Sequence, residues 1–130
     1  MIVDASAVLA ILFSEPESDS FEEALLAAGQ RNDISAVNFL EAAVRVDRLG
    51  SDRKSGEFDK LIDSLSLEIV PVTAEQAHLA REAYKKFGKG NHEARLNLGD
   101  CFAYALAKAR GGPLLFKGDD FRRTDVEPAL

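Results

Sequence analysis

Hydrophobic and polar residues along the chain follow two spacings, one typical of strands and one typical of helices. Short runs of apolar and β-branched residues predict strands at residues 1–4, 33–36, 67–72 and 114–116. Apolar residues spaced three and four apart predict helices at residues 5–13, 18–28, 37–49, 58–65, 74–87 and 96–110. Glycines directly after three of these segments, at Gly29, Gly50 and Gly111, fit helix ends. Helical segments therefore separate each predicted strand from the next.

This arrangement sets the expected architecture. Strands joined by helices pair in parallel, because a crossover of a dozen or more residues is needed to return the chain in the same direction. We expect an α/β fold with a parallel central sheet of about four or five strands, flanked by helices. No repeat, low-complexity tract or linker divides the sequence, so residues 1–130 are expected to form a single domain.

Composition narrows the class of protein. The 46% hydrophobic and 29% charged residues are typical of a folded globular protein. The single cysteine, Cys101, can form neither an internal disulfide nor a thiolate zinc site. The longest apolar run, at residues 5–13, has about half of the ~20 residues that a membrane span needs, and it lacks the flanks of a signal peptide. We therefore expect a cytoplasmic protein that does not bind membranes.

The charge balance has two opposite implications. The chain has 16 basic and 22 acidic residues, a formal net charge of −6, which disfavours broad electrostatic binding to nucleic acid. A metal site, however, needs carboxylates that stay uncompensated until the ion binds. The positions of the acids therefore matter more than their number.

Three candidate acids lie at predicted strand ends. Asp4 ends the first strand, and Asp119 and Asp120 follow the last one. Ligands of open α/β sheets bind beyond the carboxyl ends of the strands, so these side chains are expected at one edge. Each also has an ordinary alternative, because Asp4 suits a helix N-cap and the pair Asp119 and Asp120 suits a polar turn.

Two more candidate acids lie on predicted helices. An apolar stripe that includes Leu40 and Val44 is expected to face inward, and Glu41 lies beside it. A carboxylate there needs a cation, which either a metal ion or a buried ion pair supplies. Asp100 lies three residues after Asn97, the spacing of a capping box, and it opens an apolar helix that places it at the mouth of a pocket.

One metal site explains all these acids, whereas their ordinary roles need separate explanations. Carboxylates within a few ångströms raise one another's pKa values unless a cation joins them, and oxygen ligands suit Mg²⁺ or Mn²⁺ better than zinc. Such ions activate water and stabilise the leaving oxygen of a phosphodiester. The acids therefore predict metal-dependent hydrolysis without a protein nucleophile.

Weaker signals surround these acids. Ser6 could hydrogen-bond a carboxylate or a water, although a serine in a first helical turn is common. Lys117 lies near the end of the last strand. A group of basic residues could contact phosphates, or could simply face solvent. This group comprises Lys85, Lys86, Lys89, Arg95, Arg122 and Arg123.

Four stretches together resemble the PIN-domain toxins of VapBC-type toxin–antitoxin systems. They are residues 2–7, residues 35–42, residues 96–107 and residues 115–121, the last followed by Thr124 and Asp125. The resemblance spans the chain, and the stretch at residues 96–107, LNLGDCFAYALA, is the most specific of the four.

This resemblance implies a magnesium- or manganese-dependent endoribonuclease. Asp4, Glu41 and Asp100 fall on the metal-binding acids of the family, and the fourth position is Asp120, with Asp119 as the alternative. The resemblance also implies an RNA substrate, a homodimer and a small antitoxin protein that blocks the acidic site. The further candidates for substrate binding are Ser6, Arg95 and Lys117.

Three other functions fit less well. A phosphoacceptor receiver domain needs an acceptor aspartate at the end of a central strand, where Val70 and Val72 stand. A phosphatase of the haloacid-dehalogenase type needs a second aspartate where Ser6 stands. A non-catalytic binding module of the same fold stays open, although the full set of acids favours an enzyme.

Overall fold

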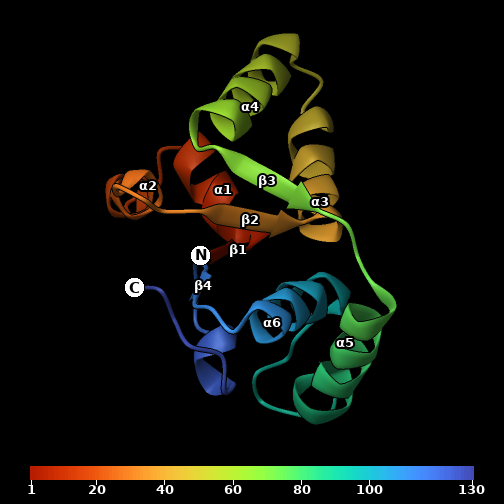
Figure 1. The fold of residues 1–130 in the computed structure, drawn as a ribbon. Coiled ribbons are helices and arrows are strands. Elements are labelled where there is room, and N and C mark those ends of the chain that lie inside the picture. Colours follow the sequence, from red (N-terminus) through yellow and green to blue (C-terminus); the bar gives the residue numbers. More distant parts are fainter.

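The computed structural model describes residues 1–130 as a four-stranded sheet with six helices around it (Figure 1). The strands are β1 (Ile2–Val3), β2 (Asn32–Ser35), β3 (Leu67–Val70) and β4 (Leu114–Leu115). The helices are α1 (Ala5–Leu12), α2 (Ser18–Leu26), α3 (Ala36–Asp47), α4 (Asp52–Ser64), α5 (Ala74–Phe87) and α6 (Leu98–Arg110). A short 3₁₀ helix, η1 (Phe121–Arg123), follows β4.

All strand pairs are parallel, in the order β3-β2-β1-β4. Ile2 is in register with Asp33 on one side and with Leu114 on the other, which makes β1 a central strand. The predicted α/β fold with a parallel sheet is therefore confirmed, with four strands. No helix is long and apolar enough to cross a membrane.

The sheet separates two hydrophobic cores of 17 buried residues each. Successive strand residues point to opposite faces, so Ile2 and Leu114 enter the core beneath α5 and α6. Val3 and Leu115 enter the core formed with α1, α2, α3 and α4. Figure 1 shows the same division, with α5 and α6 on one side of the sheet and α1, α3 and α4 on the other.

Capping residues explain where the predicted helix boundaries shift. Asn97 accepts a hydrogen bond from Asp100 N at 2.9 Å, so α6 begins at Leu98 rather than at residue 96. Ser51 accepts from Lys54 N at 3.2 Å, so α4 begins well before residue 58. Gly111 ends α6 in the left-handed conformation, with φ of 67°. Asp4 and Ser35 cap α1 and α3 at the ends of β1 and β2, so these helices follow their strands directly, whereas the ten residues 88–97 separate α5 from α6.

Candidate functional site

Asp4 joins the end of β1 to the start of α1 and is 3% exposed. Its Oδ2 accepts hydrogen bonds from Ser6 N at 3.0 Å and from Ser6 Oγ at 2.6 Å, which is the N-cap role that the sequence allowed. Its Oδ1 is buried and has no hydrogen-bond partner. Burial raises the pKa of Asp4 above its ordinary value. One oxygen therefore anchors the side chain, and the other is free for a ligand.

Ser6 links Asp4 to the end of β4. Lys117 N donates to Ser6 Oγ at 3.0 Å, so the hydroxyl directs its own hydrogen to Asp4. The Lys117 ammonium itself pairs with Glu15 and, at 3.6 Å, with Glu17. The backbone of Lys117 thus supports the site, and its side chain is paired with acids of the segment after α1.

Glu41 is half-buried on α3 and lies against the start of α6. A Cβ added to Gly99 would overlap Glu41 Oε2 and would lie 2.8 Å from Glu41 Cδ. The buried Asn38 donates to Gly99 O at 2.9 Å and so joins α3 to α6 at this point. Burial, and then the charge of Asp4, raise the pKa of Glu41.

The apolar stripe of α3 that lies beside Glu41 was predicted to face inward, and this prediction is wrong because the stripe faces outward. Leu40 is 61% exposed and Val44 is 44% exposed, whereas the buried face of α3 holds Asn38, Ala42 and Val46. The small Ala42 and Gly99 allow α3 and α6 to approach closely. The buried amide of Asn38 is tolerated there because it donates a hydrogen bond to Gly99 O.

Asp100 occupies the first turn of α6 as the reciprocal partner of the Asn97 cap. Asn97 N donates to Asp100 Oδ2 at 3.0 Å, which completes the capping box. Burial raises the pKa of Asp100 to about 7, although the hydrogen bond from Asn97 opposes the shift, and the charges of Asp4, Glu41 and Asp120 contribute to it. Because each charge affects the pKa of Asp100, the four carboxylates lie in one neighbourhood.

Asp119 and Asp120 are both exposed in the turn between β4 and η1. Asp120 raises the pKa of Asp100, and it lines a hollow of about 290 Å³ together with Lys89, Arg95 and Asn97. Asp119 does not contribute to the pKa shift of Asp100 and does not line this hollow. These observations favour Asp120 as the fourth acid.

The fit of this neighbourhood to a metal ion has two sides. The donors are oxygens, and the buried, unpartnered Oδ1 of Asp4 is the kind of atom that a cation satisfies. In their present positions, however, no three histidine, cysteine or acidic side chains are grouped closely enough to hold an ion. The donor chemistry suits Mg²⁺ or Mn²⁺, and the side chains would have to draw together to bind it.

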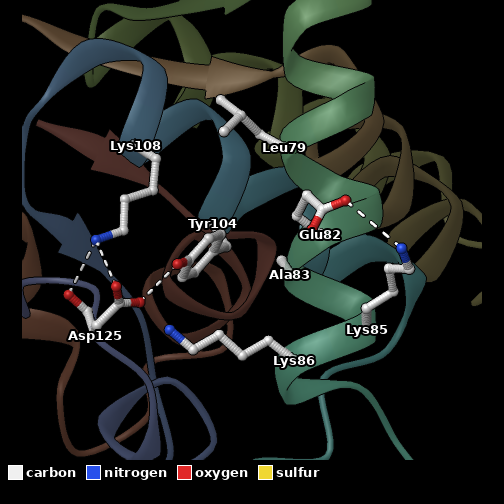
Figure 2. A pocket seen from close by; sticks show the side chains of 8 residues that line it. All are labelled: Leu79, Glu82, Ala83, Lys85, Lys86, Tyr104, Lys108 and Asp125. Carbon is white, nitrogen blue, oxygen red and sulfur yellow. Dashed lines mark hydrogen bonds and ion pairs between the residues drawn. The ribbon is translucent and has the colours of Figure 1, made fainter.

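A larger hollow lies elsewhere, between α5, α6 and Asp125 (Figure 2). It measures about 600 Å³ and includes none of the four acids. Most of its polar groups are already paired, because Tyr104 donates to Asp125 at 2.6 Å, Lys108 binds the same carboxylate at 3.1 Å, and Lys85 pairs with Glu82. Asp125 thereby ties the C-terminal segment to α6.

Two residues that shape the acidic neighbourhood, Asn38 and Gly99, were not predicted as site residues. Asn38 stands within the stretch at residues 35–42 and Gly99 within the stretch at residues 96–107. The position of Gly99 could have been noticed in the sequence, because a glycine beside a candidate acid in an apolar helix indicates that another part of the chain approaches the helix backbone closely.

Comparison with known proteins identifies the family. The sequence model of the PIN domain family matches residues 1–127 of this chain. The chain belongs to the PIN-domain family. It is 43% identical over 126 residues to ribonuclease VapC30 of Mycobacterium tuberculosis, covering 97% of this chain and 95% of that protein. It is 44% identical to a ribonuclease VapC of Mycolicibacterium smegmatis, with 97% of each chain covered.

Solved structures show the same PIN fold. The crystal structure of VapC20 from M. tuberculosis, a toxin that cleaves the sarcin–ricin loop, gives a TM-score of 0.75 at 16% identity, with 96% of this chain and 95% of that chain covered. VapBC2 from Rickettsia felis, bound to a promoter DNA fragment, gives a TM-score of 0.74 at 20% identity and covers 98% of this chain and 94% of that one. The chain is thus a PIN-domain relative of the VapC ribonucleases.

Proposed function

We propose that this PIN domain, formed by residues 1–130, is a Mg²⁺- or Mn²⁺-dependent endoribonuclease and the toxin of a type II toxin–antitoxin pair. The observation that carries the proposal is the unpartnered, buried Oδ1 of Asp4 in a neighbourhood of carboxylates whose charges add to the effect of burial in raising the pKa of Asp100. The similarity to VapC ribonucleases supports RNA as the substrate.

The metal ligands in this proposal are Asp4, Glu41, Asp100 and Asp120. A bound ion would activate a water for attack on phosphorus and would stabilise the charge on the leaving oxygen. Ser6 fixes the direction of the Asp4 carboxylate, and the capping box fixes that of Asp100. Because one oxygen of each of these two carboxylates is held in this way, Asp4 and Asp100 would lose little conformational freedom when the four ligands draw together around an ion.

The assembly is proposed on the same basis. Solved relatives include VapBC2 and a toxin–antitoxin complex from Klebsiella pneumoniae, and a small antitoxin is the proposed partner here. We also propose a homodimer. Its candidate contacts are the exposed apolar residues Leu40 and Val44 on α3 and Leu98, which is 73% exposed at the start of α6.

The test is cleavage of a panel of structured RNAs by the purified protein with Mg²⁺, with Mn²⁺ or with EDTA, followed by mapping of the cut ends. Asp100→Asn is the matched variant, because asparagine can still accept the Asn97 N–H and preserve the cap. We expect cleavage only with metal, and its loss in Asp100→Asn.

A second readout separates catalysis from folding. Asp100→Asn removes one of several mutually repelling carboxylates, so the thermal stability measured in EDTA should be equal to or higher than that of the wild type. Full activity of a folded Asp100→Asn variant would contradict the site. Absence of cleavage under all conditions by the wild type would favour a binding module.

A further inference from the structure

A second polar hollow borders the acidic site and has a different character. It measures about 290 Å³ and is lined only by Lys89, Arg95, Asn97 and Asp120. Asp120 belongs to the acidic neighbourhood, and Asn97 forms the capping box with Asp100. The hollow therefore adjoins the acids, and its other two side chains are cations.

These two cations are not engaged by the protein. Lys89 and Arg95 are exposed and take part in no side-chain ion pair or hydrogen bond, although the side chains of Arg31, Lys108, Arg110 and Lys117 all do. In the hollow of Figure 2, by contrast, two of the three lysines are paired, Lys108 with Asp125 and Lys85 with Glu82 at 3.8 Å, and the third, Lys86, lies 5.1 Å from the Phe87 ring centroid. Lys89 and Arg95 can thus bind an anion without breaking an internal contact.

The loop that carries both cations is fixed at its base. Lys89 N donates to Leu96 O at 2.9 Å, and Leu96 N donates to Phe87 O at 3.0 Å. Arg123 Nη1 donates to Glu93 O at 3.1 Å and joins the loop to η1. This pairing holds Lys89 and Arg95 near each other across the loop.

The backbone of Arg95 is strained. Its φ of 57° lies in the left-handed region, which costs a residue with a side chain about 1 kcal/mol. The residues on either side of Arg95 in the chain, Ala94 and Leu96, are both buried and fix its backbone. His92 Nδ1 also accepts a hydrogen bond from Ala94 N at 2.9 Å. The fold maintains this conformation, and Arg95 is exposed between two buried residues while lining the hollow.

We propose that Lys89 and Arg95 form a subsite for an RNA phosphate next to the one that is cleaved. The inference rests on the proposed ribonuclease function. A protein of net charge −6 with a cluster of carboxylates repels a polyanion, so productive binding needs local cations beside those acids. Lys89 and Arg95 supply them at the border of the site.

The experiment compares a single-stranded RNA oligonucleotide with bis(p-nitrophenyl) phosphate, a diester that has no neighbouring phosphate. The variants are Lys89→Gln, Arg95→Asn and Arg95→Lys, and asparagine is chosen because it tolerates the left-handed region. Lys60→Gln is the matched control, since Lys60 is an exposed cation on α4, which lies away from α5 and α6 (Figure 1).

For the oligonucleotide we expect Lys89→Gln and Arg95→Asn to raise KM about tenfold with kcat nearly unchanged. Each should also reduce the slope of log(kcat/KM) against log[salt] by about 0.7, the value for one phosphate contact on a single strand. Arg95→Lys should retain most of the affinity. Hydrolysis of the small diester should be unaffected, and Lys60→Gln should behave as the wild type.

Two results would overturn the subsite. One is an equal loss of activity on both substrates, which would mean that Lys89 and Arg95 affect the carboxylates of the acidic site and do not bind a neighbouring phosphate. The other is wild-type kinetics on RNA for both charge-removing variants. If the wild type cleaves neither substrate, the proposed function fails, and fluorescence anisotropy with labelled RNA in EDTA then tests the subsite separately. In that assay, variants that bind RNA as tightly as the wild type would exclude the subsite, and so would a wild type that does not bind RNA detectably.

Discussion

Glu41 and Gly99 are in direct contact across the α3–α6 interface, and the contact leaves no room for a Cβ on Gly99. The atoms in the way are the two oxygens and the Cδ of the Glu41 carboxylate, which form the end of a flexible side chain. Asn38 holds the same peptide through its hydrogen bond to Gly99 O. Glycine at this position thus determines where one candidate metal ligand can lie.

Gly99→Ala should therefore impair activity more than stability. The added methyl displaces the Glu41 carboxylate, and a displacement of about 1 Å in a catalytic site can cost about 100-fold in rate. The backbone is helical at this position, so alanine causes no backbone strain. RNA cleavage rates and thermal melting measured on the same preparation test this expectation.

The matched control is Gly56→Ala, in α4. A Cβ at Gly56 meets no atom within 4 Å, so this change should raise stability by about 0.5–1 kcal/mol and leave cleavage intact. If Gly99→Ala cleaves RNA at the wild-type rate, the position of Glu41 does not matter for the reaction.

The sequence predicts the architecture well because local signals and packing agree there. Periodicity identifies all four strands and six helices, and the cap at Asn97 is visible in its spacing from Asp100. For Asp4 and Asp100, the ordinary capping role and the candidate metal role turn out to be compatible. Each carboxylate engages one oxygen in a cap, and Asp4 keeps the other free.

The sequence does not reveal the surroundings of Glu41. Hydropathy places Leu40 and Val44 inward, but they are exposed, because an apolar face suited to a partner has the same pattern as one suited to the core. The contact of Glu41 with Gly99 joins positions 58 residues apart, as the numbering shows. No local pattern encodes such a contact, and only the packing of α3 on α6 establishes it.

Ser6→Ala should reduce cleavage about tenfold, a typical effect of removing a group that orients a metal ligand. The change removes the hydrogen bond to Asp4 Oδ2 and leaves Lys117 N without its acceptor. It should also cost about 1 kcal/mol of stability. Kinetics and denaturant unfolding measure the two effects, and Ser6→Thr should restore both because it keeps the hydroxyl.

Ser64→Ala is the control for this change. Its hydroxyl donates to Leu61 O on the exposed face of α4, far from the acids in sequence and fold. We expect it to leave cleavage unchanged. A Ser6→Ala variant with the full wild-type rate would show that the Asp4 carboxylate keeps its direction without this hydrogen bond.

Tyr104→Phe should weaken the attachment of the C-terminal segment in a pH-dependent way. The hydrogen bond from Tyr104 at 2.6 Å, followed by the interaction with Lys108, lowers the pKa of Asp125 below its ordinary value. A lowered pKa in the folded state means that the stabilisation is complete above the ordinary value of about 4. It is lost as the pH falls through the lower pKa of the folded protein.

We therefore expect Tyr104→Phe to lower the free energy of unfolding by about 1 kcal/mol at pH 7, a value discounted because Asp125 is half-exposed. The difference from the wild type should shrink as the pH falls below 4, where Asp125 becomes protonated in both proteins. Urea unfolding across this range is the measurement. Tyr84→Phe, which removes only an exposed hydrogen bond of 3.3 Å to Lys89 O, provides the baseline. A difference that stays constant from pH 7 to pH 2 would show that the Asp125 charge plays no part in the attachment.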